Sequence, residues 1–339
     1  MSPNILLIYT GGTIGMVKDY DTGALKAFNF DELLLKIPEL RLLDCEISTV
    51  SFEEPLDSSN MNPEYWSQIC GYIQEGYEQY DGFVVLHGSD TMSYTASALS
   101  FMLENLAKPV ILTGSQLPIG DLRTDAKENL ITAVQLAALR KRNRPVIQEV
   151  ALYFEYKLYR GNRTTKVSAE HFEAFDSPNY PPLLTSGVHL RINEETLFRP
   201  SKRQLKVHTS LVTEIMLIKL YPGISESVVG HMLSLVGLKG VIIETYGAGN
   251  ATTQTWFVQM LKQLIKSGIP VVNITQCIGG SVQMGNYETS VGLKKIGLIN
   301  GADMTSEAAV AKMMYLLGQK LGPKAFKTVY ETSLRGEMS

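Results

Sequence analysis

Cysteine is scarce in this 339-residue chain: Cys45, Cys70 and Cys277 are odd in number and far apart. Small secreted domains that depend on disulfides carry more cysteines, usually in even numbers. The pattern therefore excludes a disulfide framework and favours a reducing compartment. The histidines are scattered too, and neither an HExxH nor a CxxC motif occurs. Because zinc sites need such clusters, we expect no metal site.

The sequence also lacks the long apolar runs and the charge excess of membrane and nucleic-acid-binding proteins. Its longest apolar runs are only strand-sized, too short to span a membrane. The first residues, MSPNILLIYTGG, have no basic segment and too short an apolar stretch for a secretory signal. A net charge of -3 gives no general attraction to nucleic acid or anionic lipid. We predict a cytoplasmic protein with no nucleic-acid or membrane partner.

What recurs is a short run of Val, Ile and Leu that ends in glycine with hydroxyl or amide residues. The runs cover residues 5–13, 83–91, 110–116, 241–250 and 271–280. Continuous apolar strands of this kind are typical of a parallel sheet covered on both faces. Between them, helical patterns cover residues 94–106, 128–139 and 252–266, and another helix starts at Ser306. Alternating strands and helices predict an α/β fold.

The length of 339 residues predicts two domains, because a single hydrophobic core usually stops growing before a chain reaches this length. The segment 191–212 is charged, carries Pro200 and has no sustained helical period. We interpret it as a linker and leave open a hairpin within it. The prediction is two three-layer α/β domains with largely parallel sheets, a larger one at residues 1–190 and a smaller one at 213–339.

A glycine-rich loop follows the first apolar run, with the sequence GGTIG at residues 11–15. Glycine permits positive φ and close approach of the backbone to a ligand. In an open α/β sheet, ligands bind beyond the carboxyl ends of the strands. The spacing fits neither a dinucleotide fingerprint nor a P-loop. Thr13 is therefore a nucleophile, part of an anion-binding turn, or simply a residue of a tight turn; a nucleophile would need a base and oxyanion donors nearby.

Three more polar segments could meet this loop: LDSSN at residues 56–60, HGSDT at 87–91 and RGNRTTK at 160–166. Turn formation or helix capping would explain each of them alone. Basic residues in such loops are usually solvated or bind anions. A buried lysine can also act as a base, and Lys166 beside a hydroxyl and a carboxylate would complete a proton relay.

Taken together, these motifs resemble the bacterial-type L-asparaginases, most closely the cytoplasmic type I enzymes, over essentially the whole chain. The matching strings are YTGGTIGM, PLDSSNM, LHGSDTMSYTASALSFMLENL, TGSQLP, LYRGNRTTK, TYGAGN and GADMTSEAA. The resemblance implies hydrolysis of L-asparagine to L-aspartate and ammonia without a cofactor. It implies that Thr13 is the acylated nucleophile and that Ser89, Asp90 and Lys166 form the proton relay.

The same resemblance assigns the substrate's head group and the assembly. Asp57, Ser58 and Ser59 would hold the α-amino and α-carboxylate groups, which need an anion and hydrogen-bond donors respectively. Relatives of this kind form homodimers, often paired into homotetramers. Asn250 would then contribute to the site of a neighbouring protomer.

Three positions depart from the family pattern. Ser89 replaces the usual threonine but keeps its hydroxyl, so we expect activity to be retained. Ala24 stands near the place of a tyrosine that is common after the nucleophile. Tyr287 is one candidate for that role, and an ordinary surface or interface tyrosine is the alternative. Glu244 replaces an arginine that binds an allosteric asparagine in some members, so we expect that site not to work in the same way.

Other functions remain open on the sequence. A broader glutaminase-asparaginase would use the same residues, and the amidase subunit of a transamidation system would need a further domain. A non-catalytic amino-acid or nucleotide-binding protein could use the GGTIG loop as an anion nest. Ammonia release separates the enzymes from the binder.

Overall fold

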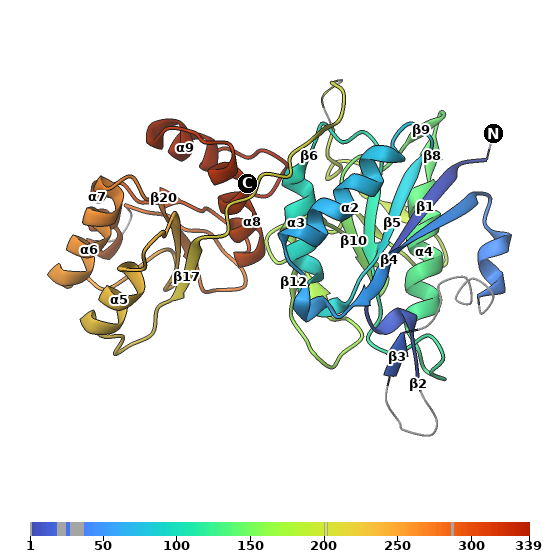
Figure 1. Cartoon of the computed structure of the whole chain (residues 1–339), viewed down its shortest axis with the longest axis horizontal. Coiled ribbons are helices and arrows are strands. Elements are labelled where there is room, and N and C mark those ends of the chain that lie inside the picture. The colour runs from blue at the N-terminus through green and yellow to red at the C-terminus, as the bar shows by residue number, and fades with distance from the viewer. Residues whose placement is uncertain (1, 19–24, 28–36, 200, 202, 286–287) are drawn as a thin grey trace. The chain divides into compact units, whose positions relative to one another are not determined.

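The computed structural model describes residues 2–18, 25–27, 37–199, 201, 203–285 and 288–339. The chain divides into two compact units, Met1–Thr209 (unit 1) and Ser210–Ser339 (unit 2). Each unit has its own mainly parallel sheet with helices packed against it (Figure 1). The predicted α/β class, with a larger first and a smaller second domain, is confirmed.

Unit 1 is built on an eight-stranded sheet with the order β15-β14-β11-β10-β7-β5-β1-β4. The strands from β4 to β10 are parallel, and β11, β14 and β15 continue the sheet as antiparallel strands. Their bounds are β1 Asn4–Gly11, β4 Glu46–Leu56, β5 Gly82–Leu86, β7 Val110–Thr113, β10 Val150–Phe154, β11 Lys157–Arg160, β14 Leu184–Thr185 and β15 Arg191–Ile192. Four neighbouring parallel strands, β4, β1, β5 and β7, therefore end at one edge of the sheet.

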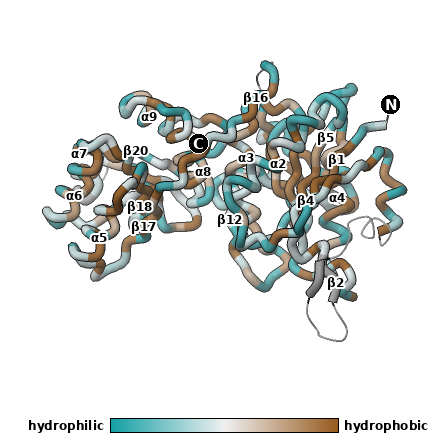
Figure 2. The backbone as a smooth tube through the Cα atoms, viewed as in Figure 1, coloured by the Kyte–Doolittle hydropathy of each residue, from teal (hydrophilic) through white to brown (hydrophobic). Residues whose placement is uncertain are grey.

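Helices cover both faces of this sheet. Helix α4 (Ala126–Ala138) packs against alternate residues of β1, β5 and β7, whose apolar side chains are buried with it. Helices α3 (Met92–Met102) and α2 (Pro63–Glu75) pack together, with α3 against β7 and β10. Each fully buried aliphatic side chain contributes about 1.5–3 kcal/mol to such a core. Figure 2 shows hydrophobic stretches of the tube in this part of unit 1, near the labels of β1 and β5.

Shorter elements decorate unit 1. They are the turns η1 Thr13–Gly15, η2 Pro38–Leu42, η3 Ser58–Asn60, η4 Ser89–Thr91 and η5 Gly161–Arg163. Four small ribbons pair β2 (Met16–Lys18) with β3 (Leu25–Ala27), β8 (Arg140–Lys141) with β9 (Arg144–Pro145), β12 (Thr165–Lys166) with β13 (Phe175–Asp176), and β16 (Lys206–Val207) with β6 (Leu103–Glu104). The turns η1, η3 and η4 each follow a strand of the parallel set.

Unit 2 has a four-stranded parallel sheet with the order β17-β18-β19-β20. Its strands are β17 Ile215–Lys219, β18 Gly240–Thr245, β19 Val271–Thr275 and β20 Ile299–Asn300. Helices α5 (Glu226–Leu233), α6 (Thr255–Lys266) and α7 (Glu288–Ile296) pack over one core. Helices α8 (Ser306–Gly318) and α9 (Pro323–Tyr330) pack together, with α8 against β17 and β18.

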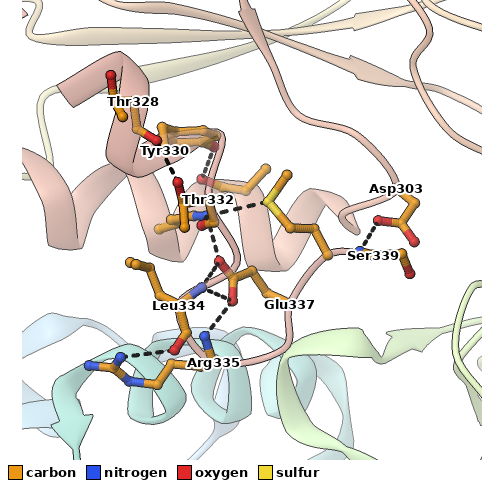
Figure 3. A network of polar contacts seen from close by, with 11 residues as sticks. Asp303, Thr328, Tyr330, Thr332, Leu334, Arg335, Glu337 and Ser339 are labelled. Atoms are coloured by element: carbon orange, nitrogen blue, oxygen red, sulfur yellow. Dashed lines mark hydrogen bonds and ion pairs between the residues drawn. The ribbon is translucent and has the colours of Figure 1, made fainter. Parts of the chain in front are cut away.

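Helix α8 carries Lys312, one partner of a buried ion pair in unit 2. The other partner, Glu337, is labelled in Figure 3. Lys312 Nζ donates to Glu337 Oε1 at 2.5 Å and to the carbonyl of Thr332 at 2.8 Å. Both charged side chains have 0% exposure. The other hydrogen bonds of Glu337 come from the backbone N–H groups of Leu334 and Arg335. Burial lowers the pKa of Lys312, and the attraction of Glu337 opposes that shift.

The structure corrects several details of the sequence prediction. Strand β4, the outermost parallel strand of the unit 1 sheet, was not predicted, because its side chains are mostly polar and exposed. The helix expected to reach residue 106 ends at Met102, and β6 begins at the next residue, Leu103. The helix at Ser306 does start there, but Thr305 is its N-cap and accepts the N–H of Ala308.

The segment interpreted as a linker, residues 191–212, contributes to unit 1 in part. Its strand β15 pairs with β14, and β16 pairs with β6. No hairpin is formed among the described residues of this segment, because both strands find partners outside it. The boundary between the two units lies at Thr209 and Ser210.

Candidate functional site

The candidate site lies at the carboxyl edge of the parallel strands of unit 1. The loops after β4, β1, β5 and β7 begin with Asp57, Gly12, His87 and Gly114 respectively. Because these strands are neighbours in the sheet, the four loops meet at one edge. Ligands of open α/β sheets bind at such an edge.

Two glycines allow the Thr13 loop to touch its neighbours. Gly11 has φ +127°, and a Cβ there would collide with the backbone of Leu56 at the end of β4. Gly12 has φ +87°, and its Cβ would lie 2.5 Å from the backbone nitrogen of Gly88. A side chain at either position would push the loops apart, so the close packing requires glycine. Thr13 therefore sits directly beside the loop that carries Ser89 and Asp90.

Lys166 joins this cluster from a distant part of the chain. Its Nζ donates to Ser89 Oγ at 2.8 Å and to Asp90 Oδ1 at 2.7 Å. The Lys166 side chain is 17% exposed, whereas that of Asp90 is 64% exposed. The hydroxyl of Ser89 in turn donates to Gln116 Oε1 at 3.0 Å. The predicted hydroxyl–lysine–carboxylate arrangement is thus present, with a glutamine added after β7.

The path of the chain explains how Lys166 reaches the edge. Strand β11 is antiparallel to β10, so it ends at the opposite edge of the sheet. The turn η5 then packs along α3, where Gly161 lies against Ala96. Thr164 Oγ1 donates to the carbonyl of Gly161 at 2.9 Å and fixes that turn. Pairing of β12 with β13 holds Lys166 in place afterwards.

The second predicted cluster, Asp57, Ser58 and Ser59, forms a capped turn. Asp57 Oδ1 accepts the N–H of Ser59 at 2.8 Å. Asp57 and Ser59 are exposed, and Ser58 is buried. The hydroxyl of Thr91 donates to the carbonyl of Ser58 at 2.7 Å. This bond ties the turn to the Ser89 loop, so the two clusters keep a fixed spacing.

A buried histidine stabilises the start of the Ser89 loop through hydrogen bonds. His87 is fully buried, with Nδ1 2.7 Å from the carbonyl of Gly88 and Nε2 2.8 Å from Thr95 Oγ1. Burial lowers the pKa of His87 to about 4, so the ring is neutral near pH 7. Nδ1–H then donates to the carbonyl, and Nε2 accepts from Thr95. Trp66 Nε1 donates to the same Thr95 oxygen at 3.0 Å and completes the chain.

A tyrosine that the sequence argument did not single out packs against the GGTIG loop. Tyr9 belongs to β1, and its hydroxyl occupies the space where a side chain of Gly15 would stand. Burial raises the pKa of Tyr9 to about 12, so the phenol stays neutral at neutral pH. The only sequence signal was its position two residues before Gly11, inside a strand that is otherwise aliphatic.

Gln116 is the second residue that sequence reasoning missed. Its backbone N–H donates to the carboxylate of Asp125, with a shortest distance of 2.9 Å, and its side-chain Nε2 donates to the carbonyl of His171. Asn129 Nδ2 donates to the carbonyl of Gly114 in the same loop. Burial raises the pKa of Asp125 in spite of these backbone donors. The TGSQLP string is one of the family motifs quoted above, and the structure shows that its glutamine accepts a hydrogen bond from Ser89.

The remaining predicted residues lie in unit 2 or outside the described residues. Asn250 belongs to unit 2, where it forms a bridge with Tyr246 after β18. Tyr287, the candidate tyrosine, and Ala24 lie outside the described residues. Glu244 is nearly buried in unit 2, accepts the hydroxyl of Ser306 at 2.5 Å and lies 3.8 Å from Lys219.

Two absences among the described residues bear on cofactors and membranes. In that part of the chain, no group of three or more His, Cys, Asp or Glu side chains could hold a metal ion. Among the same residues, no helix has the length and apolar character needed to cross a bilayer.

Comparison with known proteins finds similar sequences over nearly the whole chain. The family model "Asparaginase, N-terminal" matches residues 4–198, and "Glutaminase/Asparaginase C-terminal domain" matches residues 214–330. The chain is 45% identical over 337 residues to L-asparaginase 1 of Escherichia coli K12, covering 99% of this chain and 98% of that protein.

Solved structures of L-asparaginases are also similar to this chain. L-asparaginase I from Vibrio cholerae is similar with a TM-score of 0.91 and 42% identity, and the match covers 100% of both chains. A probable cytoplasmic L-asparaginase from Campylobacter jejuni is similar with a TM-score of 0.79 and 25% identity, covering 98% of this chain and 100% of that one.

Proposed function

Because the chain belongs to the asparaginase family, we propose that it hydrolyses L-asparagine to L-aspartate and ammonia, with Thr13 as the nucleophile. The observation that carries the proposal is the position of Lys166, whose Nζ contacts both Ser89 Oγ and Asp90 Oδ1. A largely buried lysine between a hydroxyl and a carboxylate, beside a threonine in a glycine-rich loop, suits proton transfer to and from a nucleophile.

The reaction divides into two steps. The relay of Ser89, Asp90 and Lys166 takes the hydroxyl proton of Thr13, and the threonine oxygen attacks the side-chain amide carbon of asparagine. Backbone N–H groups of the GGTIG loop are suited to stabilise the oxyanion that forms. The C–N bond breaks, the relay protonates the leaving nitrogen, and ammonia departs. Water then attacks the β-aspartyl ester on Thr13, releases aspartate and restores the hydroxyl.

The turn of Asp57, Ser58 and Ser59 provides a place for the amino-acid head group. The exposed carboxylate of Asp57 attracts the α-ammonium group, and hydroxyl and N–H donors of the turn suit the α-carboxylate. The bond from Thr91 to the carbonyl of Ser58 supports this assignment, because it fixes the distance from the head group to the relay. A substrate held at one end then presents its amide to Thr13.

Ammonia release from L-asparagine and from L-glutamine tests the proposal. We expect release from asparagine, abolition in Thr13→Ala, and a severe loss in Lys166→Met. Lys206→Met, which removes an exposed lysine of the same unit, is the matched control and should behave as wild type. Denaturing mass spectrometry of a rapidly quenched reaction should detect an aspartyl adduct on Thr13. Failure of the wild type to release ammonia, or an unimpaired Thr13→Ala, would reject the proposal.

We extend the proposal to the assembly and the compartment. A homodimer or homotetramer would let Asn250 and Tyr287 act in the site of a neighbouring protomer. The cytoplasmic compartment is supported by the scarcity of cysteine and by the cytoplasmic relative from Campylobacter jejuni. Mixing inactive Thr13→Ala and Asn250→Ala subunits tests the shared site, since exchange should restore part of the activity. No recovery from mixtures proven to exchange subunits would contradict it.

A further inference from the structure

A basic pocket lies on the opposite edge of the unit 1 sheet from Thr13. Its cationic side chains come mainly from the β8–β9 ribbon, which follows α4. Arg140 at the start of the ribbon pairs at 2.7 Å with Asp81, the residue just before β5. Because β5 begins there and ends beside the candidate site, the ribbon lies at the amino-terminal edge of the strands. The pocket is therefore separate from the asparagine site.

The pocket concentrates positive charge in a chain that is negative overall. It has a volume of about 640 Å³ and is lined by four cationic residues and one carboxylate, Glu194. Lys141 Nζ lies 2.6 Å from Glu194, so this pair neutralises itself. Within the described part of the chain, the other three cations, Arg142, Arg144 and Arg199, form no ion pair. Lys141 and, to a smaller extent, Arg199 lower the pKa of Glu194, so one carboxylate is shared between two of the four cations. The excess of exposed cations around one hollow still gives it a positive potential that favours an anion.

The turn between β8 and β9 carries one of these guanidinium groups, that of Arg142. Arg142 and Asn143 have φ +51° and +62°, in the left-handed region that turns of this kind normally fill with Asn, Asp or Gly. Asn143 follows that preference, whereas Arg142 does not. An arginine in such a position costs stability. Binding of an anion by its side chain would explain the choice.

Besides Gln148, the rest of the pocket lining is apolar. Pro145, Val146, Leu197 and Phe198 line it and are half-buried, so they offer a hydrophobic wall next to the guanidinium groups. Guanidinium binds phosphate in a bidentate manner, and several together match a di- or triphosphate better than a single carboxylate. A ligand that fits both parts carries a phosphate chain and a flat apolar body. The volume is within the range of small-molecule sites.

We propose that this pocket binds a nucleotide, with its phosphates on Arg142, Arg144 and Arg199 and its base against the wall of Pro145, Leu197 and Phe198. The site would take a ligand unrelated to asparagine, at the far edge of the same sheet. An extended nucleic acid is a poorer fit, because the basic residues surround one hollow in an acidic chain.

Calorimetric titration of the full chain with ADP and with pyrophosphate tests the assignment. ADP should bind saturably, and more tightly than pyrophosphate, because only ADP uses the apolar wall. Arg144→Glu combined with Arg199→Glu should weaken ADP binding at least about tenfold. Arg142→Asn should weaken it severalfold while suiting the turn better, which guards against a loss caused by misfolding. Ammonia release from asparagine should persist in these variants and report a folded unit 1.

Arg123→Glu is the matched control, because Arg123 is an exposed arginine in the loop after β7, at the opposite edge of the sheet. It should leave ADP binding unchanged. Absence of saturable ADP binding by the wild type would overturn the proposal, and so would unchanged binding in the double variant. Pyrophosphate binding as tightly as ADP would overturn the role of the wall. Much tighter binding of a single-stranded RNA oligonucleotide than of ADP would overturn the assignment of a small ligand.

Discussion

Two lysine–carboxylate pairs, one in each unit, have nearly the same distance but opposite surroundings. Lys166 and Asp90 lie 2.7 Å apart in unit 1, and the carboxylate is 64% exposed. Lys312 and Glu337 lie 2.5 Å apart in unit 2, and both side chains are completely buried. The distances alone would suggest the same role for both pairs.

Their further contacts separate the two roles. Lys312 and Glu337 use their other hydrogen bonds on the backbone of residues 332–335 and on Met338 Sδ, so the pair holds one segment of chain to α8. Lys166 instead uses its second bond on the hydroxyl of Ser89, a side chain at an open sheet edge. A carboxylate in water can exchange protons and ligands, whereas a sealed one cannot without a large penalty. The exposure of Asp90 and the hydroxyl beside Lys166 are the reasons why we propose proton transfer for this pair and a structural role for Lys312 and Glu337.

The largest effect is expected from Lys166→Met, which should reduce the rate of ammonia release by about 10²- to 10⁴-fold, the usual contribution of a proton-transfer group. The free energy of unfolding should change by less than about 1 kcal/mol, because its partner Asp90 is solvated. Steady-state kinetics and urea unfolding measure the two quantities on one preparation. A variant that unfolds easily and keeps its specific activity would reverse the roles assigned to the pairs.

The converse change, Glu337→Gln, should mainly affect stability. It leaves the charge of Lys312 buried without an anion, which costs about 3–5 kcal/mol. The double variant Lys312→Met with Glu337→Leu should recover much of that loss, since it removes both charges together. Urea midpoints at one pH provide the comparison. A single variant as stable as wild type would show that the pair contributes nothing to unit 2.

Glu155 extends the comparison to a buried carboxyl surrounded by other carboxyls. Burial, followed by Asp125, Glu128 and Glu173, raises its pKa from 4.5 to about 7. A raised pKa contributes stability below pH 4.5 and loses it as the pH rises through about 7. Relative to Glu155→Gln, the wild type should therefore lose about 1–3 kcal/mol between pH 4.5 and 8.

Urea unfolding of wild type and Glu155→Gln at pH 5 and pH 8 measures this difference. Glu53→Gln changes an exposed glutamate on the edge strand β4 and is the control. It should show no comparable dependence on pH. Parallel behaviour of wild type and Glu155→Gln across this window would refute the assignment.

The smallest effect is expected from Ser89→Thr, which adds one methyl group and keeps the hydroxyl that Lys166 and Gln116 contact. Ammonia release should stay within about threefold of wild type, because the hydrogen-bonding groups are unchanged. Ser89→Ala is the companion variant and should lose much more. Equal rates for the alanine and threonine variants would show that the hydroxyl has no part in the relay.

The sequence predicted the parts of the site that depend on local pattern. Apolar runs identified β1, β5 and β7, and the glycine and hydroxyl residues after them marked Thr13 and Ser89. It could not show that Lys166 reaches Ser89 across 77 positions, because that contact depends on the path of η5 along α3. The place of Tyr9 under Gly15 was equally hidden, since it results from packing of one loop on one strand.

The net charge also limited what could be predicted about binding sites from the sequence. A value of -3 argued against binding of large polyanions, and it says nothing about how charges are distributed. The cations of the β8–β9 ribbon are close in sequence, but Arg199 joins them only through the fold. The pocket was therefore invisible to composition.

The bond from Trp66 to Thr95 has a practical consequence for spectroscopy. The chain has two tryptophans, and Trp66 lies in unit 1 whereas Trp256 lies in helix α6 of unit 2. Trp66 is 5% exposed and shares Thr95 with His87, so its emission colour reports on the packing beneath the Ser89 loop. In a Trp256→Phe background, fluorescence would follow unit 1 alone, and in Trp66→Phe it would follow unit 2 alone. The molecule thus carries one intrinsic optical probe for each half, and no added dye is needed to record them separately.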